Sequence, residues 1–395
     1  MLDSIYVGMT GLLSYSQGLR VIANNTANMN TPGFKGSVLQ FSDLGYTQQH
    51  LGGPGAGTST QLGFGVNTLG TRLSFAPGEM RQTDNDLDLA VDGQGMFVLR
   101  EDDGTLSYTR AGQFQFNTDG VLVNQADKLP VMGYDAAGNL VMISLAGQMT
   151  HPGKPTARVS FTGNLSSTAT EQTVGSVKVV DAAGGEHTLS VKFTNTASTE
   201  AGTWKVELMD GSTSVGSGVI AFVDGKPVAD RSSVAITYKP AGLAEQALTL
   251  DFGTDVSSFA SGNLSTLAMK TQDGVAPGAL TGATFDASGR LVMRYANGQT
   301  RQGPALALAR AESPDAVGAE GDNRFRMLDP AAWRSGTAGA NGFGSVRSRT
   351  VEVSNVDLSR EFSDLVVMQR GYQASSQVIS TANEMLQELF QMKSK

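Results

Sequence analysis

The two ends of this 395-residue chain carry helical patterns, whereas the region between them carries strand patterns. Near the N-terminus, apolar residues recur at alternating steps of three and four, which is the spacing of a coiled-coil seam. These positions are Leu2, Ile5, Met9, Leu12, Leu19 and Ala23, and Ser16 interrupts them. An asparagine-rich segment with Pro32 and Gly33 follows, and it predicts that the helix ends by about residue 30.

The C-terminal segment mirrors the first. Asp357 is a predicted N-cap and Glu361 lies in the first turn, where a negative charge favours the helix. Apolar residues recur every seven positions, with two aromatic residues at intervening seam positions: Leu358, Leu365, Tyr372, Ile379 and Leu386, with Phe362 and Phe390. An offset second stripe comprises Val378, Ala382, Met385 and Leu389. Two stripes expose more apolar surface than one partner helix can cover. This favours burial of the stripes against other copies of the chain over a helical bundle closed within a single chain.

Alternating apolar residues predict short strands in the middle of the chain, for example around Tyr108, Phe114 and Trp204 and over 291–295. Asp-Gly and Asn-Gly pairs recur between such runs and suit tight turns between antiparallel strands. The predicted fold class is therefore multidomain α+β, with an inner all-β domain and an inserted outer all-β sandwich or barrel. The predicted parts are terminal helices over 1–30 and 357–395, connecting segments over 31–72 and 345–356, an inner β domain over 73–146 and 273–344, and an outer β domain over 147–272.

Composition excludes several classes of protein. The net charge of −8 argues against a nucleic-acid surface, which needs clustered lysine and arginine. No run of 18 apolar residues is present, so we expect no membrane insertion. The first ten residues lack the pattern of a cleaved signal peptide. With no cysteine, the chain has no disulfide, thiol nucleophile or thiolate metal ligand.

Motifs for catalysis are absent, and we expect no catalytic residue, no cofactor and no metal site. The histidines His50, His151 and His187 are isolated, which is typical of surface residues. An acidic string, Asp84, Asp86, Asp88 and Asp92, imitates the start of a calcium loop. Leu89 stands where that loop needs glycine, and Gly95 where it needs glutamate. The string is better explained by a strand with one exposed and one buried face, although the sequence leaves open whether Asp84, Asp86 and Asp88 bind a cation.

Two ordered motifs at opposite ends of the chain resemble those of the flagellar rod, hook and hook-associated axial proteins. The first covers 21–28 and 30–35 and includes Asn24, Asn25 and Pro32; the second covers 354–358, 369–374 and 379–386 and includes Asn355 and Gly371. Between them, segments 85–91, 95–97 and 108–112 are similar to the β domain of rod and hook members. Segments 285–289 and 295–300, with the inserted region, resemble the hook members.

This resemblance implies a structural subunit of the flagellar hook, a curved and flexible tube that acts as a universal joint. It implies self-assembly through the terminal helices and export through the flagellar type III apparatus without a cleaved signal peptide. Implied neighbours are the distal rod protein, the hook cap protein and the hook–filament junction protein. The predicted subunit interface comprises Leu2, Ile5, Met9, Leu12, Leu19, Leu358, Phe362, Leu365, Tyr372, Ile379, Leu386 and Leu389. A distal rod or hook-associated protein is the nearest alternative, and a β-rich surface adhesin is a more distant one.

Overall fold

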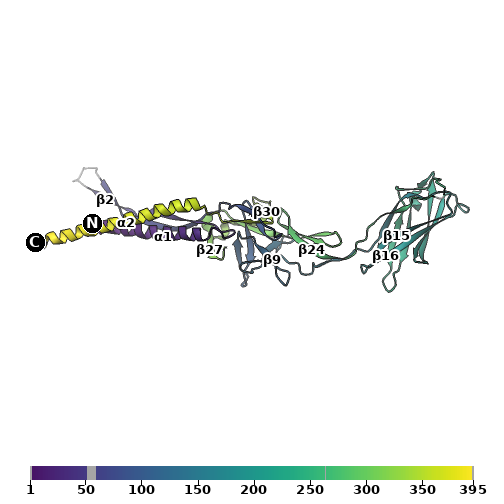
Figure 1. The fold of residues 1–395 in the computed structure, drawn as a ribbon, viewed down its shortest axis with the longest axis horizontal. Helices are drawn as coiled ribbons and strands as arrows, with labels where there is room; N and C mark the ends of the chain where they lie inside the picture. The colour runs from purple at the N-terminus through teal and green to yellow at the C-terminus, as the bar shows by residue number, and fades with distance from the viewer. Residues whose placement is uncertain (1, 51–58, 263, 394–395) are drawn as a thin grey trace. The chain divides into compact units, whose positions relative to one another are not determined.

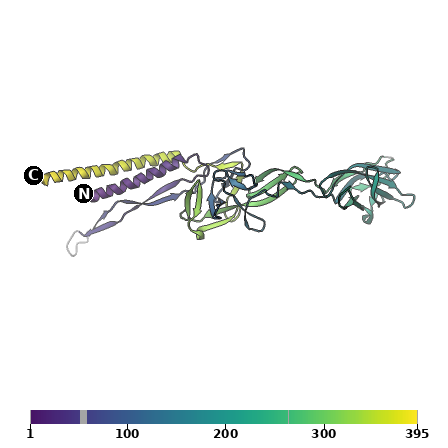
Figure 2. The same ribbon diagram turned by 90° about the horizontal axis from the view of Figure 1, so that it is seen from below.

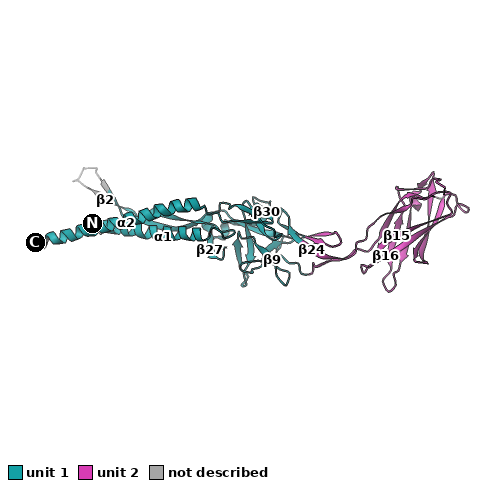
Figure 3. Ribbon diagram, viewed as in Figure 1, with its two compact units in different colours: residues 1–146, 283–292, 302–395 teal, residues 147–282, 293–301 magenta. Residues whose placement is uncertain are grey.

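A computed structural model describes residues 2–50, 59–262 and 264–393 (Figure 1). The chain forms two compact units, coloured separately in Figure 3. Unit 1 comprises residues 1–146, 283–292 and 302–395, and unit 2 comprises residues 147–282 and 293–301. The described residues are mostly β, with one long helix near each end of the chain, which confirms the coarse fold prediction. Neither of these helices has the length and apolar character needed to cross a membrane.

The helices α1 (Leu2–Ala27) and α2 (Leu358–Lys393) pack side by side in unit 1. Their contacts join Gly8 to Ile379 and Gly18 to Met368, so the helices are antiparallel and paired residue numbers sum to about 386. The end of α2 therefore extends past the start of α1 (Figure 1). The predicted N-cap is confirmed, because Asp357 Oδ1 accepts hydrogen bonds from the amides of Ser359 at 2.8 Å and Arg360 at 3.3 Å.

A long β-hairpin follows α1, and the sequence did not predict it. Strand β1 (Ser37–Asp43) pairs antiparallel with β4 (Val66–Leu73), and β2 (Tyr46–His50) pairs with β3 (Ser59–Gly63). Figure 2 shows α1 between this hairpin and α2. Thr10 Oγ1 accepts a hydrogen bond from the Val66 amide at 3.3 Å, and the rings of Tyr15 and Phe41 lie 6.1 Å apart.

The β domain of unit 1 combines strands from both halves of the sequence. The early strands are β5 (Met80–Gln82), β6 (Leu89–Asp92), β7 (Met96–Arg100), β8 (Leu106–Thr109), β9 (Phe114–Phe116), β10 (Leu122–Asn124), β11 (Met132–Tyr134) and β12 (Leu140–Met142). The late strands are β26 (Thr300–Ala311), β27 (Val317–Gly321), β28 (Arg324–Met327), β29 (Trp333–Thr337), β30 (Ser345–Ser348) and β31 (Thr350–Glu352). Early strands pair with late ones, as in β7 with β26, β6 with β30 and β5 with β31.

The core of this domain lies on the sheet that contains β7, β8, β26, β27, β28 and β29. Tyr108 stacks on Trp333 with ring centroids 4.3 Å apart, and the Trp333 indole donates a hydrogen bond to the Ala316 carbonyl at 3.1 Å. Phe97 meets Phe114 edge to face at 5.0 Å. The predicted strands around Tyr108 and Phe114 are thus confirmed.

The prediction of one exposed strand face for the acidic string is wrong. Residues 84–87 form a bend and a turn, Asp88 makes only an isolated bridge to Gln113, and β6 begins at Leu89. Leu89, Ala90 and Val91 are all buried, so both faces of β6 are covered. Part of the burial of β6 comes from the close approach of Gly112, whose carbonyl accepts a hydrogen bond from the Leu89 amide at 2.8 Å.

Unit 2 contains two five-stranded sheets that share one hydrophobic core. One sheet comprises β15 (Glu171–Val180), β16 (Glu186–Asn195), β17 (Thr203–Asp210), β18 (Thr213–Val223) and β19 (Lys226–Pro227). The other comprises β14 (Arg158–Asn164), β20 (Ser233–Tyr238), β21 (Gln246–Asp251), β22 (Val256–Ser257) and β23 (Ala268–Gln272). Buried Trp204, Phe193 and Phe252 fill the space they share. The short β13 (Thr150–His151) pairs with β24 (Gly278–Phe285), and β24, β25 (Arg290–Tyr295) and β26 contain residues of both units.

Two of the predicted dipeptide turns close hairpins in unit 2. Asp210-Gly211 joins β17 to β18, and Asp224-Gly225 joins β18 to β19. Asp224 has a φ of 53° and Gly225 a φ of 75°, which is the left-handed geometry that such a turn needs.

Candidate subunit interface

On the α1 side, the contact between α1 and α2 includes small residues that the predicted apolar stripe did not contain. Gly8, Gly11 and Gly18 of α1 are buried and face α2. A Cβ atom on Gly8 would lie 2.7 Å from Ile379 Cγ1, and one on Gly371 of α2 would lie 2.5 Å from the Tyr15 ring. Glycine at these positions therefore lets the two helix backbones approach closely.

Enlarging a residue at this contact should loosen the helix pair. We expect Gly8→Leu to cost about 1–3 kcal/mol through overpacking, partly offset by the roughly 1 kcal/mol gain in helix propensity over glycine. Hydrogen exchange of the α1 and α2 amides measures this, and protection should fall. Ser4→Leu adds a similar side chain at an exposed position of α1 and is the matched control. Unchanged protection in Gly8→Leu would contradict the close contact.

The predicted interface residues divide into two groups. Partly buried within the chain are Ile5, Leu12, Leu19, Leu358, Leu365, Ile379 and Leu386. Exposed are Met9, Phe362, Tyr372 and Leu389. Leu2 begins α1, and its side chain lies outside the described residues. Ile379 contacts Gly8 of α1.

More apolar side chains are exposed than the sequence stripes predicted. On the helices these include Tyr6, Leu13, Val366, Val367 and Met392, and the predicted stripe residues Val378, Met385 and Phe390 are exposed as well. On the hairpin they include Val38, Phe41, Leu44, Tyr46, Leu62, Phe64 and Leu69. Phe390 is 71% exposed and Leu13 is 62% exposed. Apolar surface of this extent is typical of protein–protein contact sites.

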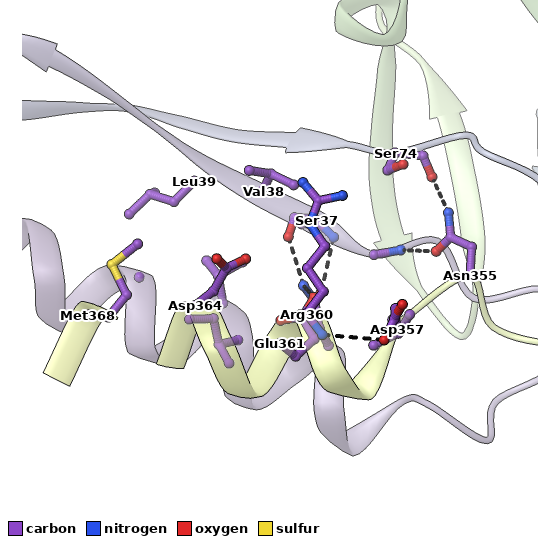
Figure 4. Close-up of a pocket in the computed structure, with 16 residues that line it drawn as sticks. Ser37, Val38, Leu39, Ser74, Asn355, Asp357, Arg360, Glu361, Asp364 and Met368 are labelled. Atoms are coloured by element: carbon purple, nitrogen blue, oxygen red, sulfur yellow. Dashed lines mark hydrogen bonds between the residues drawn. The ribbon is translucent and has the colours of Figure 1, made fainter. Parts of the chain in front are cut away.

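The helices are fixed to the β domain at a point that we call the helix root, formed by Asn25, Ser37, Asn355 and Glu361. Figure 4 shows Ser37, Asn355 and Glu361 there. Asn25 Nδ2 donates to the Ser37 carbonyl at 2.8 Å and to Glu361 Oε1 at 3.0 Å. Asn355 Nδ2 donates to the Ser74 carbonyl at 2.7 Å, and its Oδ1 accepts from the Gly36 amide at 2.8 Å. These asparagines belong to the two terminal motifs, so their motif positions have a structural role.

A cavity of about 200 Å³ lies at the helix root, and Figure 4 shows the residues around it. It is lined by both helices and by β1, with Asp357, Arg360, Glu361 and Asp364 on the α2 side. Partial burial raises the pKa of Glu361 above its usual value, although the hydrogen bond from Asn25 acts in the opposite direction. The root therefore holds a carboxylate that is half removed from water.

A buried charge cluster lies in the β domain next to the root. Glu352 Oε1 accepts hydrogen bonds from Lys35 Nζ at 2.6 Å and from the Gly78 amide at 2.8 Å. Its Oε2 accepts from Arg110 Nη1 at 3.2 Å. The side chains of Lys35 and Glu352 have no exposed surface. Burial lowers the pKa of Lys35 and of Arg110, and the charge of Glu352 opposes this in both. Nothing in the sequence predicted this cluster, because lysine and glutamate are rarely buried.

The acidic string does not form a cluster of carboxylates. Asp86 pairs with Arg349 at 3.4 Å, while buried Asp88 accepts a hydrogen bond from Asn85 at 3.0 Å. Among the described residues, no group of three histidine or acidic side chains is arranged to hold a metal ion.

Half-buried His187 lies 2.7 Å from Asp181 and lowers the pKa of that carboxyl through a hydrogen bond.

Three protein-family models match parts of the chain. "Flagella basal body rod protein" matches residues 5–35, "Flagellar hook protein FlgE/F/G D1 domain" matches residues 90–151, and "Flagellar basal body rod FlgEFG protein C-terminal" matches residues 347–392. The members of the buried charge cluster come one from each segment: Lys35, Arg110 and Glu352. The cluster thus joins all three matched segments in space.

Whole-chain relatives are also found. The flagellar hook protein FlgE of Borreliella burgdorferi is 29% identical over 448 aligned positions, which cover 100% of both chains. The flagellar hook protein FlgE of Escherichia coli K12 is 28% identical over 418 positions, which cover 98% of both chains. The crystal structure of the Helicobacter pylori flagellar hook protein FlgE2 superposes with a TM-score of 0.50 at 13% identity, covering 69% of this chain and 100% of that one. This last match indicates a shared fold.

Proposed function

The chain belongs to the FlgE/F/G family of flagellar rod and hook proteins, and on that premise we propose that it is a structural subunit of the flagellar hook that polymerises with its own copies. The observation that carries this proposal is the match to hook proteins along the whole chain rather than along the terminal segments alone. The exposed apolar residues of α1 and α2 support it, because association with other copies would bury them. A structural role rather than an enzymatic one follows.

The apolar faces of the terminal helices would form the contacts between copies. In this proposal α1 and α2 of one copy pack against those of its neighbours as coiled coils, and the hairpin of β1 to β4 adds a second apolar face. A contact between unlike faces repeats from copy to copy and builds an open helical polymer. The β domain of unit 1 would form an inner layer of the polymer and unit 2 an outer one.

The resemblance supports further parts of this proposal. The polymer would be a curved tube that bends as it transmits torque, with the distal rod protein, the hook cap protein and the hook–filament junction protein as neighbours. Export through the flagellar type III apparatus would deliver the subunits. These neighbours and this route stay predictions.

Deletion of the gene in its own organism tests the assignment. Electron microscopy of isolated basal bodies should show complete rods without a hook and without a filament. A truncated rod would instead assign the chain to the rod, which is the alternative function within the same family. Intact hooks and filaments would contradict both assignments and would favour a surface adhesin.

A further inference from the structure

A cavity beside the buried charge cluster carries positive charge on its wall. The cavity has a volume of about 380 Å³ and lies in unit 1 between the segment before β5, the start of β7 and the end of β26. Apolar residues form much of its lining: Phe75, Pro77, Met96, Pro314 and Val317. Two arginines, Arg110 and Arg310, also line it.

Arg110 brings positive charge that its own partners do not balance. Its Nη1 donates to the Val91 carbonyl at 2.9 Å and its Nη2 to the Gly93 carbonyl at 2.6 Å. The single carboxylate of Glu352 is shared between Arg110 and Lys35, so two buried cations bind one anion. Within the described part of the chain, Arg110 Nε is buried without a hydrogen-bond partner. Because a buried charge without a counter-ion is unfavourable, a second anion would be favoured here.

Arg310 brings a second guanidinium to the same cavity. Its Nη1 donates to Gln94 Oε1 at 2.9 Å, and its Cζ lies 5.7 Å from the centre of the Phe343 ring. Like Arg110, it has a buried Nε with no hydrogen-bond partner among the residues described. Glu312 also lines the cavity, but it is paired with Arg334 at 3.1 Å. Guanidinium groups bind carboxylates through two parallel N–H donors, which makes a carboxylate the matching ligand.

We propose that this cavity receives the carboxylate of an aspartate or glutamate side chain from a second copy of the chain, so that each β domain of unit 1 holds an acidic residue of a neighbour. This inference rests on the proposed self-assembly. With a net charge of −8, every copy presents an excess of acidic side chains to a cavity of opposite sign. The apolar lining suits the methylene stem of a side chain, whereas a free inorganic anion would find no apolar complement there.

The test compares the unaltered chain with its variants by the lowest protein concentration at which polymer sediments. Arg310→Gln should raise it at least about 30-fold, because it removes one partner of a desolvated charge pair. Arg310→Lys keeps the positive charge but loses the two parallel donors, so it should recover part of the assembly. Arg326→Gln is the matched control, because Arg326 is exposed on β28 and does not line the cavity. This control should assemble like the unaltered chain.

The melting temperature of the unassembled chain shows whether the cavity binds a free small anion or only a carboxylate of another copy. Inorganic phosphate and acetate should leave the unit 1 transition unchanged, because the cavity is expected to bind an anion only as part of a neighbouring copy. Anion-induced stabilisation that Arg310→Gln abolishes, together with unchanged assembly of that variant, would overturn the proposal in favour of a small-anion site. Normal assembly of Arg310→Gln without any anion effect would also overturn it, as would an Arg310→Lys variant no better than Arg310→Gln. Failure of the unaltered chain to assemble would instead count against the proposed function.

Discussion

Replacing Glu352 with alanine should lower the free energy of unfolding of unit 1 by about 3–5 kcal/mol, the usual cost of breaking a buried ion pair. The substitution leaves Lys35 and Arg110 buried without their shared carboxylate, and it also removes the acceptor of the Gly78 amide. No rearrangement within the cluster supplies a replacement charge. Differential scanning calorimetry should show the unit 1 transition moving to lower temperature.

Unit 2 provides an internal control for this experiment, since its transition should not move. Asp86→Ala is the matched variant in unit 1, because Asp86 and Arg349 form an ion pair in which both side chains are 58% exposed. Pairs of that kind contribute at most about 1 kcal/mol. If Glu352→Ala lowered the transition temperature of unit 1 no more than Asp86→Ala does, the buried cluster would not stabilise the fold in the way described.

Phe390→Asp should strongly impair assembly while leaving both units of the unassembled chain folded. Phe390 is 71% exposed, and by the register of the two helices it lies on the part of α2 that extends past α1, so the single chain gains little from it. Burying such a side chain against another copy contributes about 1.5–3 kcal/mol, and a charge at that position adds a further penalty, so the critical concentration should rise roughly 100-fold or more. Sedimentation of polymer measures this rise.

Gln387→Asp is the matched control for Phe390→Asp. It adds the same charge to an exposed polar position one turn earlier on α2, and it should assemble far better than Phe390→Asp. Leu365→Asp and Ile379→Asp would also impair assembly, but both residues are partly buried within the chain, so those variants would disturb the helix pair as well. Assembly of Phe390→Asp at the normal concentration would show that α2 contributes no apolar contact there.

Local signals predicted much of the fold. The cap at Asp357 fixed the start of α2, and the Asp-Gly pairs at Asp210 and Asp224 marked real hairpins, because each depends on residues adjacent in sequence. The α1 contact was missed because close helix packing selects small residues such as Gly8 and Gly18, which a search for apolar periodicity does not detect. The hairpin after α1 was missed because a register shift between Gln40 and Phe41 breaks its alternation.

The candidate site was harder to predict than the fold. Met9, Phe362, Tyr372 and Leu389 were named from periodicity and are exposed, as an interface between copies requires, but the single chain does not test that role. The buried cluster escaped notice because Lys35 and Glu352 are 317 residues apart. Partners at that separation leave no periodic signal in one sequence, and burial of both charges is an exception to the usual preference.

The most direct test of the central claim is thiol labelling of single-cysteine variants at exposed apolar positions of the helices. The chain has no cysteine, so Leu13→Cys or Val367→Cys introduces a unique thiol, and Lys178→Cys on unit 2 is an exposed control. We expect maleimide to label Leu13→Cys and Val367→Cys rapidly in the unassembled chain and at least about tenfold more slowly in the polymer, because neighbouring copies cover these faces. Equal labelling of Leu13→Cys and Val367→Cys before and after assembly would contradict the account.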